Sequence, residues 1–251
     1  MLKIENLSLN LGGKQILEDI SFTLRPGRIT AMVGRNGSGK SSLLACVNRQ
    51  YPYTGTVTLE GRDIALMPSR ARAKQIAILP QTLPAPSVTV EEMVAYGRTP
   101  YLDFTGRLRA DDRTAVQMSM AETGVENLRS RTVDTLSGGE RQRVALAMIL
   151  AQDTPIALLD EPTAHMDLGF EAAFLRQLWQ LREEKTFLVI LHDLSMAVRY
   201  ADDILVLDGG KLRFAGSVTS CLDTDILEKT FQLKRYTMEE NGQKRIFFSG
   251  E

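Results

Sequence analysis

The chain has 251 residues, enough for one large α/β unit or for a core domain with a smaller insert. Hydrophobic residues make up 43% and charged residues 24%, which is typical of a globular protein and excludes a disordered chain. Lys and Arg total 30 against 31 Asp and Glu, a formal net charge of −1. This balance lacks the basic excess of a nucleic-acid-binding protein, so we expect no nucleic-acid partner.

Cysteine usage and the apolar stretches exclude further classes. Cys46 and Cys221 form no CxxC pair, so we expect neither a disulfide framework nor a zinc site, and a reducing compartment fits best. Residues 1–6 lack the basic and apolar regions of a signal peptide. The densest apolar stretch, 144–151, is much shorter than the roughly 20 residues of a bilayer span. We therefore expect a chain that does not cross a membrane by itself.

The first predicted elements are short strands at 2–7, 21–24 and 29–33. The third strand leads into a glycine-rich loop and then a helical pattern at 41–49, which is the layout that a phosphate site needs. Two more strands are predicted further on. Residues 55–59 alternate Thr with apolar residues, and the apolar run 76–79 is stopped by Pro80.

The pattern changes between residues 83 and 131. Prolines open this stretch, helical patterns follow at 91–96 and 111–122, and no strong strand pattern is present. The stretch therefore predicts an inserted helical subdomain.

Helices and strands alternate after the insert. A helix at 137–152 and a strand at 156–159 precede a second helix, whose apolar stripe is formed by Phe170, Phe174, Leu178 and Leu181. A buried strand follows at 187–191. Such alternation predicts a parallel sheet covered by helices on both faces.

The end of the chain is less informative. Asp208-Gly209-Gly210 lies between strand patterns at 204–207 and 211–214, which predicts a hairpin. Residues 223–231 favour a helix, and 234–248 favour strands or a regulatory surface.

Residues 34–41 match the phosphate-binding spacing GxxxxGK[ST]. Glycines let successive backbone N–H groups point at phosphate oxygens, Lys40 can reach the β- and γ-phosphates, and the Ser41 hydroxyl can hold Mg²⁺. The alternative is a glycine-rich surface loop, but a strand before the loop and a helix after it favour the phosphate site. The predicted ATP-binding residues here are Gly34, Arg35, Asn36, Gly37, Ser38, Gly39, Lys40, Ser41 and Ser42.

Further polar residues follow predicted buried strands. Asp160 suits a contact to Mg²⁺, and Glu161 can orient or deprotonate an attacking water, although solvated loop acids are the alternative. His192 can contact the γ-phosphate or that water, whereas a lone His is more often structural. The amide oxygen of Gln81 can complete the Mg²⁺ or water shell.

A second anion site is predicted at the start of the helix 137–152. Ser137 is a good N-cap, and the following glycines expose backbone N–H groups. One nucleotide does not need two such sites in one chain, so a dimer with each ATP between two chains explains both. A plain helix cap is the alternative. The residues of this segment are Leu136, Ser137, Gly138, Gly139 and Glu140.

These motifs, in this order, resemble the ATP-binding subunit of ABC transporters over about residues 2–216. The resemblance implies an α/β P-loop NTPase core with a mostly parallel sheet, an N-terminal antiparallel β subdomain and a helical insert. The single ABC domain would comprise the core at 1–82 and 132–216, the insert at 83–131 and a tail at 217–251.

The resemblance also implies an activity and partners. It implies a homodimer, ATP hydrolysis by Glu161, His192 and Gln81, and Mg²⁺ held by Ser41, Gln81 and Asp160. It further implies coupling to a transmembrane permease through a groove near Gln81, and a peripheral place on the cytoplasmic face of the cell membrane.

Two positions depart from the family pattern. Leu11 stands where an adenine-stacking aromatic is usual, and Met166 replaces a leucine before Asp167, which would communicate across the dimer. His165 is expected at the surface.

Finer matches at 79–81, 96–100 and 147–153 resemble importers of ferric siderophores, ferric citrate, haem or cobalamin, which use an extracytoplasmic solute-binding protein. The alternatives are a soluble ABC ATPase acting on DNA, ribosomes or cofactor assembly, and an exporter ATPase. A P-loop kinase or GTPase would leave residues 136–140 unexplained.

Overall fold

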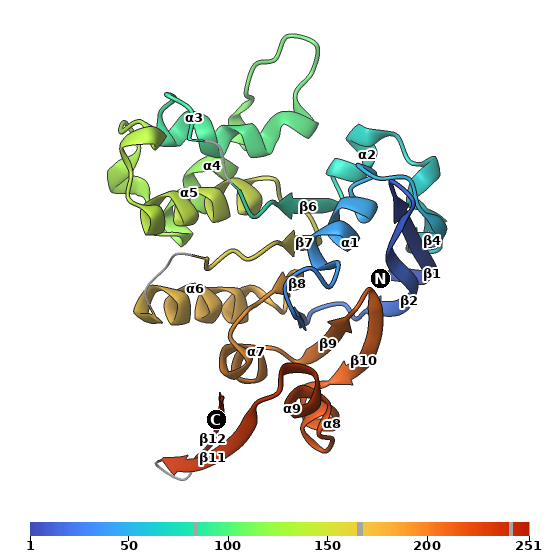
Figure 1. Cartoon of the computed structure of the whole chain (residues 1–251). Coiled ribbons are helices and arrows are strands. Elements are labelled where there is room, and N and C mark those ends of the chain that lie inside the picture. The colour runs from blue at the N-terminus through green and yellow to red at the C-terminus, as the bar shows by residue number, and fades with distance from the viewer. Residues whose placement is uncertain (83–84, 165–167, 241–242, 251) are drawn as a thin grey trace. The chain divides into compact units, whose positions relative to one another are not determined.

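The computed structural model describes residues 1–82, 85–164, 168–240 and 243–250 (Figure 1). The chain divides into two units. The first unit comprises Met1–Met67 and Leu175–Glu251, and the second comprises Pro68–Phe174. The stretch 83–131, predicted as a helical insert, lies within the second unit.

An antiparallel sheet opens the first unit. It consists of β1 (Leu2–Leu11), β2 (Lys14–Leu24), β4 (Thr54–Leu59) and β5 (Arg62–Asp63), in the order β2-β1-β4-β5. The predicted strand 21–24 is longer in the structure, because Gly12 and Gly13 both adopt positive φ and make the tight turn that pairs β2 with β1 from its start.

The parallel strands of the first unit position its functional residues. Strand β3 (Ile29–Gly34) lies between β9 (Asp203–Asp208) and β8 (Thr186–Ile190) and is parallel to both. All residues of β3 and β8 are buried, which explains why their sequences are mostly apolar. Strand β10 (Lys211–Ser217) is antiparallel to β9 and confirms the predicted hairpin.

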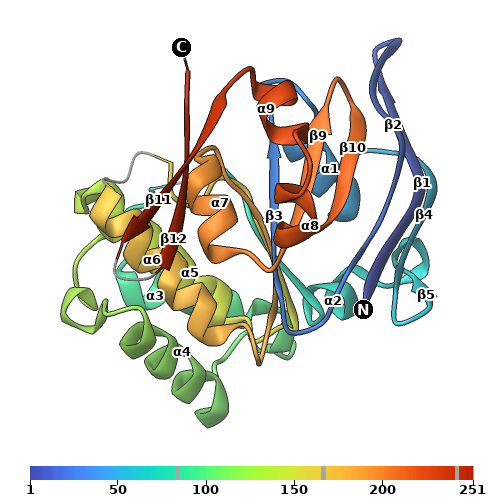
Figure 2. The same cartoon turned by 90° about the horizontal axis from the view of Figure 1, so that it is seen from below.

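Helices and a second hairpin complete the first unit. Helix α1 (Lys40–Val47) follows β3, η1 (Ile64–Leu66) follows β5, and α7 (Leu194–Tyr200) connects β8 to β9. Helices α8 (Val218–Leu222) and α9 (Ile226–Phe231) precede the hairpin of β11 (Lys234–Glu240) and β12 (Gln243–Ser249). Strand β12 packs against α7 (Figure 2).

The second unit contains a pair of parallel strands and a helical cluster. Strands β6 (Ile76–Leu79) and β7 (Ile156–Leu159) pair along their whole length, and both match their predicted bounds. The helical cluster has an apolar core that is built mainly on α3, α4 and α5. The helical elements are α2 (Ser69–Ala73), α3 (Val90–Ala95), η2 (Tyr96–Tyr101), α4 (Ala110–Glu122), η3 (Glu126–Leu128), η4 (Val133–Thr135) and α5 (Gly138–Ala151).

Helix α6 (Leu168–Leu181) corrects one sequence prediction. Phe174 and Leu178 are buried as predicted, but the side chain of Phe170 is 47% exposed. The guanidinium of Arg143 lies 5.8 Å from the centre of the Phe170 ring. The predicted apolar stripe is therefore wrong at Phe170, where a cation rather than the core contacts the ring.

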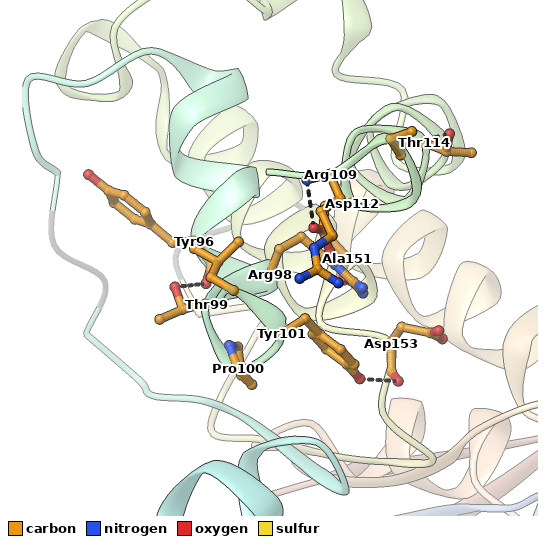
Figure 3. A network of polar contacts seen from close by, with 12 residues as sticks. Tyr96, Arg98, Thr99, Pro100, Tyr101, Arg109, Asp112, Thr114, Ala151 and Asp153 are labelled. Atoms are coloured by element: carbon orange, nitrogen blue, oxygen red, sulfur yellow. Dashed lines mark hydrogen bonds and ion pairs between the residues drawn. The ribbon is translucent and has the colours of Figure 1, made fainter. Parts of the chain in front are cut away.

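A buried ion pair fixes η2 within the second unit (Figure 3). Arg98 Nε donates to Asp112 Oδ1 over 2.9 Å, and Arg98 Nη1 donates to the Ala151 carbonyl over 2.8 Å. The guanidinium also lies 3.9 Å from the centre of the Tyr101 ring. At Gly97 a Cβ would be 2.2 Å from the Met148 carbonyl oxygen, so the backbone of η2 touches that of α5 directly. Together these contacts join η2, α4 and α5.

Within the described ranges, no helix combines the length and the apolarity needed to traverse a bilayer.

Candidate nucleotide-binding site

The loop between β3 and α1 has the backbone shape of a phosphate cradle. Gly37 and Gly39 have φ of 77° and 101°, a left-handed conformation that favours glycine. Gly34 has no room for a side chain, because a Cβ there would lie 2.2 Å from the Leu207 carbonyl oxygen. The Ser38 amide donates to the Arg35 carbonyl over 3.1 Å. Backbone conformation or lack of space therefore explains why glycine occupies these positions of the predicted motif.

Two hairpins of the first unit hold this loop. The Gly210 amide, in the β9–β10 turn, donates to the Ser38 carbonyl over 3.2 Å. The Gly210 carbonyl in turn accepts from the Glu18 amide on β2 over 2.8 Å. A Cβ at Gly39 would lie 2.6 Å from Leu17 Cδ2. This supporting role of Gly210 was not predicted from the sequence, in which only the turn motif gave a signal.

Lys40 brings a buried positive charge to the cradle. Lys40 is only 5% exposed, and its Nζ donates to the carbonyls of Gly34 over 2.8 Å and Arg35 over 3.2 Å. The N-cap of α1, Gly39, has no side chain to cap the helix, and the first turn holds no acidic residue. The positive end of α1 and the Lys40 ammonium thus favour an anion here. Ser41 is exposed and Ser42 partly buried in the same turn.

His192 belongs to the same unit and the same sheet edge as this loop. It follows β8, and the Leu191 amide donates to the Met32 carbonyl of β3 over 3.1 Å. The carboxyl ends of β3 and β8 therefore lie side by side, and His192 is exposed there. The next residue, Asp193, caps α7 by accepting from the amides of Ser195 and Met196.

Gln81, Asp160 and Glu161 meet in the second unit. Gln81 follows β6, the two acids follow β7, and the Asp160 amide donates to the Leu79 carbonyl over 2.9 Å. Gln81 Nε2 donates to Glu161 Oε2 over 2.5 Å. Asp160 is 7% exposed, and Glu161 has a φ of 49°, an uncommon conformation that often marks a functional residue. The structure thus brings together these three predicted residues.

The predicted second anion site is a helix end with a complete capping box. The Ser137 amide donates to Glu140 Oε2 over 2.8 Å, and the Glu140 amide donates to Ser137 Oγ over 3.3 Å. These hydrogen bonds from the backbone and hydroxyl of Ser137 lower the pKa of Glu140. Leu136 is buried, whereas Ser137 and Gly138 are exposed. The N-terminus of α5 is therefore capped by its own side chains and exposed.

Arg131, which was not predicted as a site residue, supports this helix N-terminus. Arg131 Nη1 lies 3.5 Å from Glu140 Oε1, and Arg131 Nη2 donates to the Thr135 carbonyl over 3.0 Å. Nothing in the sequence around Arg131 indicates this bridge, because it depends on how η4 turns the chain back towards α5.

Two further predicted residues, Leu11 and Asp167, are not part of these groups. Leu11 is the last residue of β1, paired with Lys14 and partly exposed. Asp167, with His165 and Met166, lies outside the described residues. The phosphate cradle and His192 lie in the first unit, while Gln81, Asp160, Glu161 and residues 136–140 lie in the second.

The chain belongs to the ABC transporter family and is an ATPase: its residues 17–164 match the family model, and its curated relatives are ATP-binding subunits. It is 39% identical over 236 residues to the iron(3+)-hydroxamate import ATP-binding protein FhuC of Bacillus subtilis (strain 168), covering 92% of this chain and 88% of FhuC. It is 38% identical over 237 residues to the ferric enterobactin transport ATP-binding protein FepC of Escherichia coli (strain K12), covering 93% of this chain and 88% of FepC.

The fold agrees with this family. A chain from an inward-facing structure of a metal-chelate-type ABC transporter superimposes with a TM-score of 0.86, at 24% identity, and covers 99% of this chain and 96% of its own length. The α/β P-loop NTPase fold predicted from the sequence is therefore confirmed.

Proposed function

We propose that this chain is the ATP-hydrolysing subunit that energises import of a metal chelate through a separate membrane permease, by ATP-driven closure of a homodimer. One observation carries the proposal. A loop with the shape of a phosphate cradle lies at 34–41 in the first unit, and an exposed, capped helix N-terminus lies at Ser137 in the second. A nucleotide held between the cradle of one copy and the Ser137 end of another uses both.

The two glycines after Ser137 support a partner outside the chain. Gly138 and Gly139 lack the positive φ that favours glycine, and a Cβ on either would meet no described atom within 4 Å. The described part of the chain therefore gives no reason for glycine at these positions. Close approach of a phosphate from a second copy gives one, because it needs bare backbone N–H groups.

The residues proposed for Mg²⁺ fit its chemistry. Ser41 offers a hydroxyl, Gln81 an amide oxygen and Asp160 a carboxylate, and Mg²⁺ prefers such oxygen ligands. The hydrogen bond to Glu161 uses the amide nitrogen of Gln81 and leaves its oxygen for a cation. When bound, the ion would neutralise charge on the β- and γ-phosphates.

The chain's own groups would support hydrolysis as follows. Lys40 and the N-terminal amides of α1 hold the phosphates. Glu161, oriented by the Gln81 amide, accepts the proton of the attacking water. His192, exposed at the edge where β3 enters the cradle, contacts the γ-phosphate or that water.

The names of the relatives support the proposed cargo class and partners. FhuC is named for iron(3+)-hydroxamate import and FepC for ferric enterobactin transport, and a third relative, BtuD of Halobacterium salinarum, for cobalamin import. These names favour a metal chelate over the cargo of an exporter or the substrates of a soluble ABC ATPase. We infer a peripheral place on the cytoplasmic face of the membrane, a permease docked near Gln81 and an extracytoplasmic solute-binding protein.

The first test is Glu161→Gln in the purified protein. ATP binding should persist, because Lys40 and the α1 amides are unchanged, while steady-state turnover should fall about 10²-fold or more as a general base is lost. Equilibrium dialysis and phosphate release measure the two. Glu60→Gln is the matched control, since Glu60 is an exposed glutamate with a similar φ of 50°.

Turnover of Glu161→Gln equal to that of Glu60→Gln would remove Glu161 from the mechanism. In cells that lack the chain, uptake of labelled ferric siderophore or cobalamin should return with the wild-type chain and not with Glu161→Gln. Restored uptake of neither chelate would contradict the proposed cargo class.

A further inference from the structure

The C-terminal hairpin has an open strand edge. Among the described residues, β11 (Lys234–Glu240) pairs only with β12 (Gln243–Ser249), so one edge of β11 carries backbone groups that no strand pairs. The hairpin contacts the rest of its unit mainly through β12, which packs on α7 (Figure 2). An exposed edge strand of this length is a template for pairing with another chain.

The sequence of β11 complements itself in one antiparallel register. It begins with two basic residues and ends with two acidic ones, around a central Thr237. Pairing two copies about Thr237 sets Arg235 opposite Glu239, and Tyr236 opposite Met238. Opposite charges facing each other across strands stabilise a sheet, and like charges destabilise it. Parallel pairing would set basic residues against basic ones, and a shift by two residues would lose the charge pairs.

Strand β12 offers no such match. It carries basic residues and no acidic ones, so two copies of β12 cannot set opposite charges against each other in any register. Pairing about Ile246 would also set Arg245 against Phe247. The charge pattern therefore selects β11 as the pairing edge.

One face of the hairpin supports the same arrangement. Tyr236, Met238 and Phe247 are 49%, 61% and 41% exposed, and Tyr236 lies directly opposite Phe247. In the Thr237-centred register, Met238 of the second copy would lie beside Tyr236, so the small apolar patches of two copies would become continuous.

Arg235 is already held in place. Its Nε lies 3.0 Å from Glu228 Oε1, and its Nη1 donates to the Leu222 carbonyl over 2.5 Å. Because the guanidinium is ordered within its own chain, pairing with Glu239 of a second copy would restrict little further side-chain freedom.

We propose that β11 pairs with β11 of a second copy, antiparallel and centred on Thr237, to form a four-stranded sheet across the two chains. Seven residues bury much less than the roughly 1,200 Å² of a stable interface. The inference therefore rests on the proposed function: the β11 contact would be an additional contact within the proposed homodimer. It would link the two copies at a point that does not involve ATP.

Cysteine cross-linking of the full chain tests the register. Paired residues on antiparallel strands have Cα atoms about 4.5–5.5 Å apart, within the range of a disulfide. Thr237→Cys would face itself across the pair. Glu239→Cys is the matched control on the same exposed strand, where the two copies of residue 239 would be four residues, or about 13 Å, apart.

The native cysteines give little background. Cys46 and Cys221 are buried, and burial raises the pKa of each thiol to about 11, so few thiolates are present. Under mild oxidation, Thr237→Cys should form a covalent dimer at least about tenfold faster than Glu239→Cys, measured on non-reducing gels.

Equal rates for the two variants, no dimer with Thr237→Cys, or a faster reaction of Glu239→Cys would each overturn the proposal. Phosphate release by the reduced variants separates this result from the proposed function. Normal ATP turnover without cross-linking would leave the function standing and remove the hairpin contact. Selective cross-linking in a chain that does not hydrolyse ATP would support the hairpin contact and contradict the proposed function.

Discussion

Ser137 and Thr89 make the same capping box on two helices of one unit. At the start of α3, Thr89 and Glu92 exchange the same pair of hydrogen bonds that Ser137 and Glu140 exchange at the start of α5. The donor–acceptor distances are nearly equal, 2.8 and 3.2 Å for Thr89 against 2.8 and 3.3 Å for Ser137. Because both caps stabilise a helix, comparing substitutions at Thr89 and Ser137 distinguishes this structural role from a role in ATP turnover.

Alanine at either cap should cost stability, but only one should cost activity. We expect Thr89→Ala and Ser137→Ala each to lower the free energy of unfolding by about 1 kcal/mol. Only Ser137→Ala should also lower ATP turnover, by about tenfold or more, because it removes a hydroxyl near a charged phosphate. Thermal unfolding and phosphate release measure the two effects. Equal turnover in both variants would make Ser137 a plain cap.

The candidate site residues could be predicted from the sequence, but most of the residues that support them could not. Gln81 and Glu161 are 80 positions apart, yet each follows a predicted parallel strand, and the structure joins them by a hydrogen bond. Arg131 and Gly210 could not be predicted, because their contacts with Glu140 and Ser38 depend on loop paths that no periodic pattern encodes.

Between elements, Arg98 is the main polar connection in the second unit. It lies on η2 and bonds both Asp112, in the first turn of α4, and the Ala151 carbonyl at the end of α5 (Figure 3). Burial alone would raise the pKa of Asp112, but the Arg109 amide and the Arg98 guanidinium outweigh it and hold the pKa below its usual value. Each partner thus depends on the other, since an unpaired buried charge is costly.

Asp112→Asn should lower the free energy of unfolding by about 3 kcal/mol or more, because it leaves Arg98 buried without its counter-charge. Asp111→Asn, an exposed neighbour in the same first turn, is the matched control and should cost about 1 kcal/mol at most. Guanidinium-induced unfolding measures both. Similar values for the two variants would show that the ion pair contributes little.

The same pair predicts a pH dependence. Because the folded pKa of Asp112 is lowered, its contribution is complete above the unfolded pKa of about 3.9 and is lost as the pH falls through the lower folded value. The stability gap between the wild type and Asp112→Asn should therefore be constant from pH 7 to about pH 5 and should shrink below about pH 4. A gap that grows on acidification would contradict this assignment.

Element prediction was accurate where a single physical pattern decided it. The all-apolar runs 76–79 and 156–159 match β6 and β7 because their neighbours break the strand pattern sharply. The predicted apolar stripe of α6 was wrong at Phe170, because periodicity alone could not reveal that this ring is exposed beside Arg143. Segment η2 was not predicted as a helix because its position depends on the contact of Gly97 with α5.

Across the whole chain, the residues proposed for the nucleotide site are distributed over two units. The first unit supplies the buried Lys40 and the exposed His192, and the second supplies the Gln81–Glu161 pair and the open end of α5. In the proposed homodimer, ATP on the cradle of one copy contacts the Ser137 end of α5 of the other copy, so ATP should control how tightly two chains associate.

Sedimentation of the slow variant Glu161→Gln tests this association most directly. Addition of Mg²⁺ and ATP should shift Glu161→Gln from monomer towards dimer. The double variant Glu161→Gln/Gly138→Glu should not show this shift. A carboxylate in the first turn of α5 suits the helix but repels a phosphate, while the cradle of the same chain still binds ATP. A nucleotide-loaded Glu161→Gln that stays monomeric, or a dimer that Gly138→Glu leaves intact, would contradict the account.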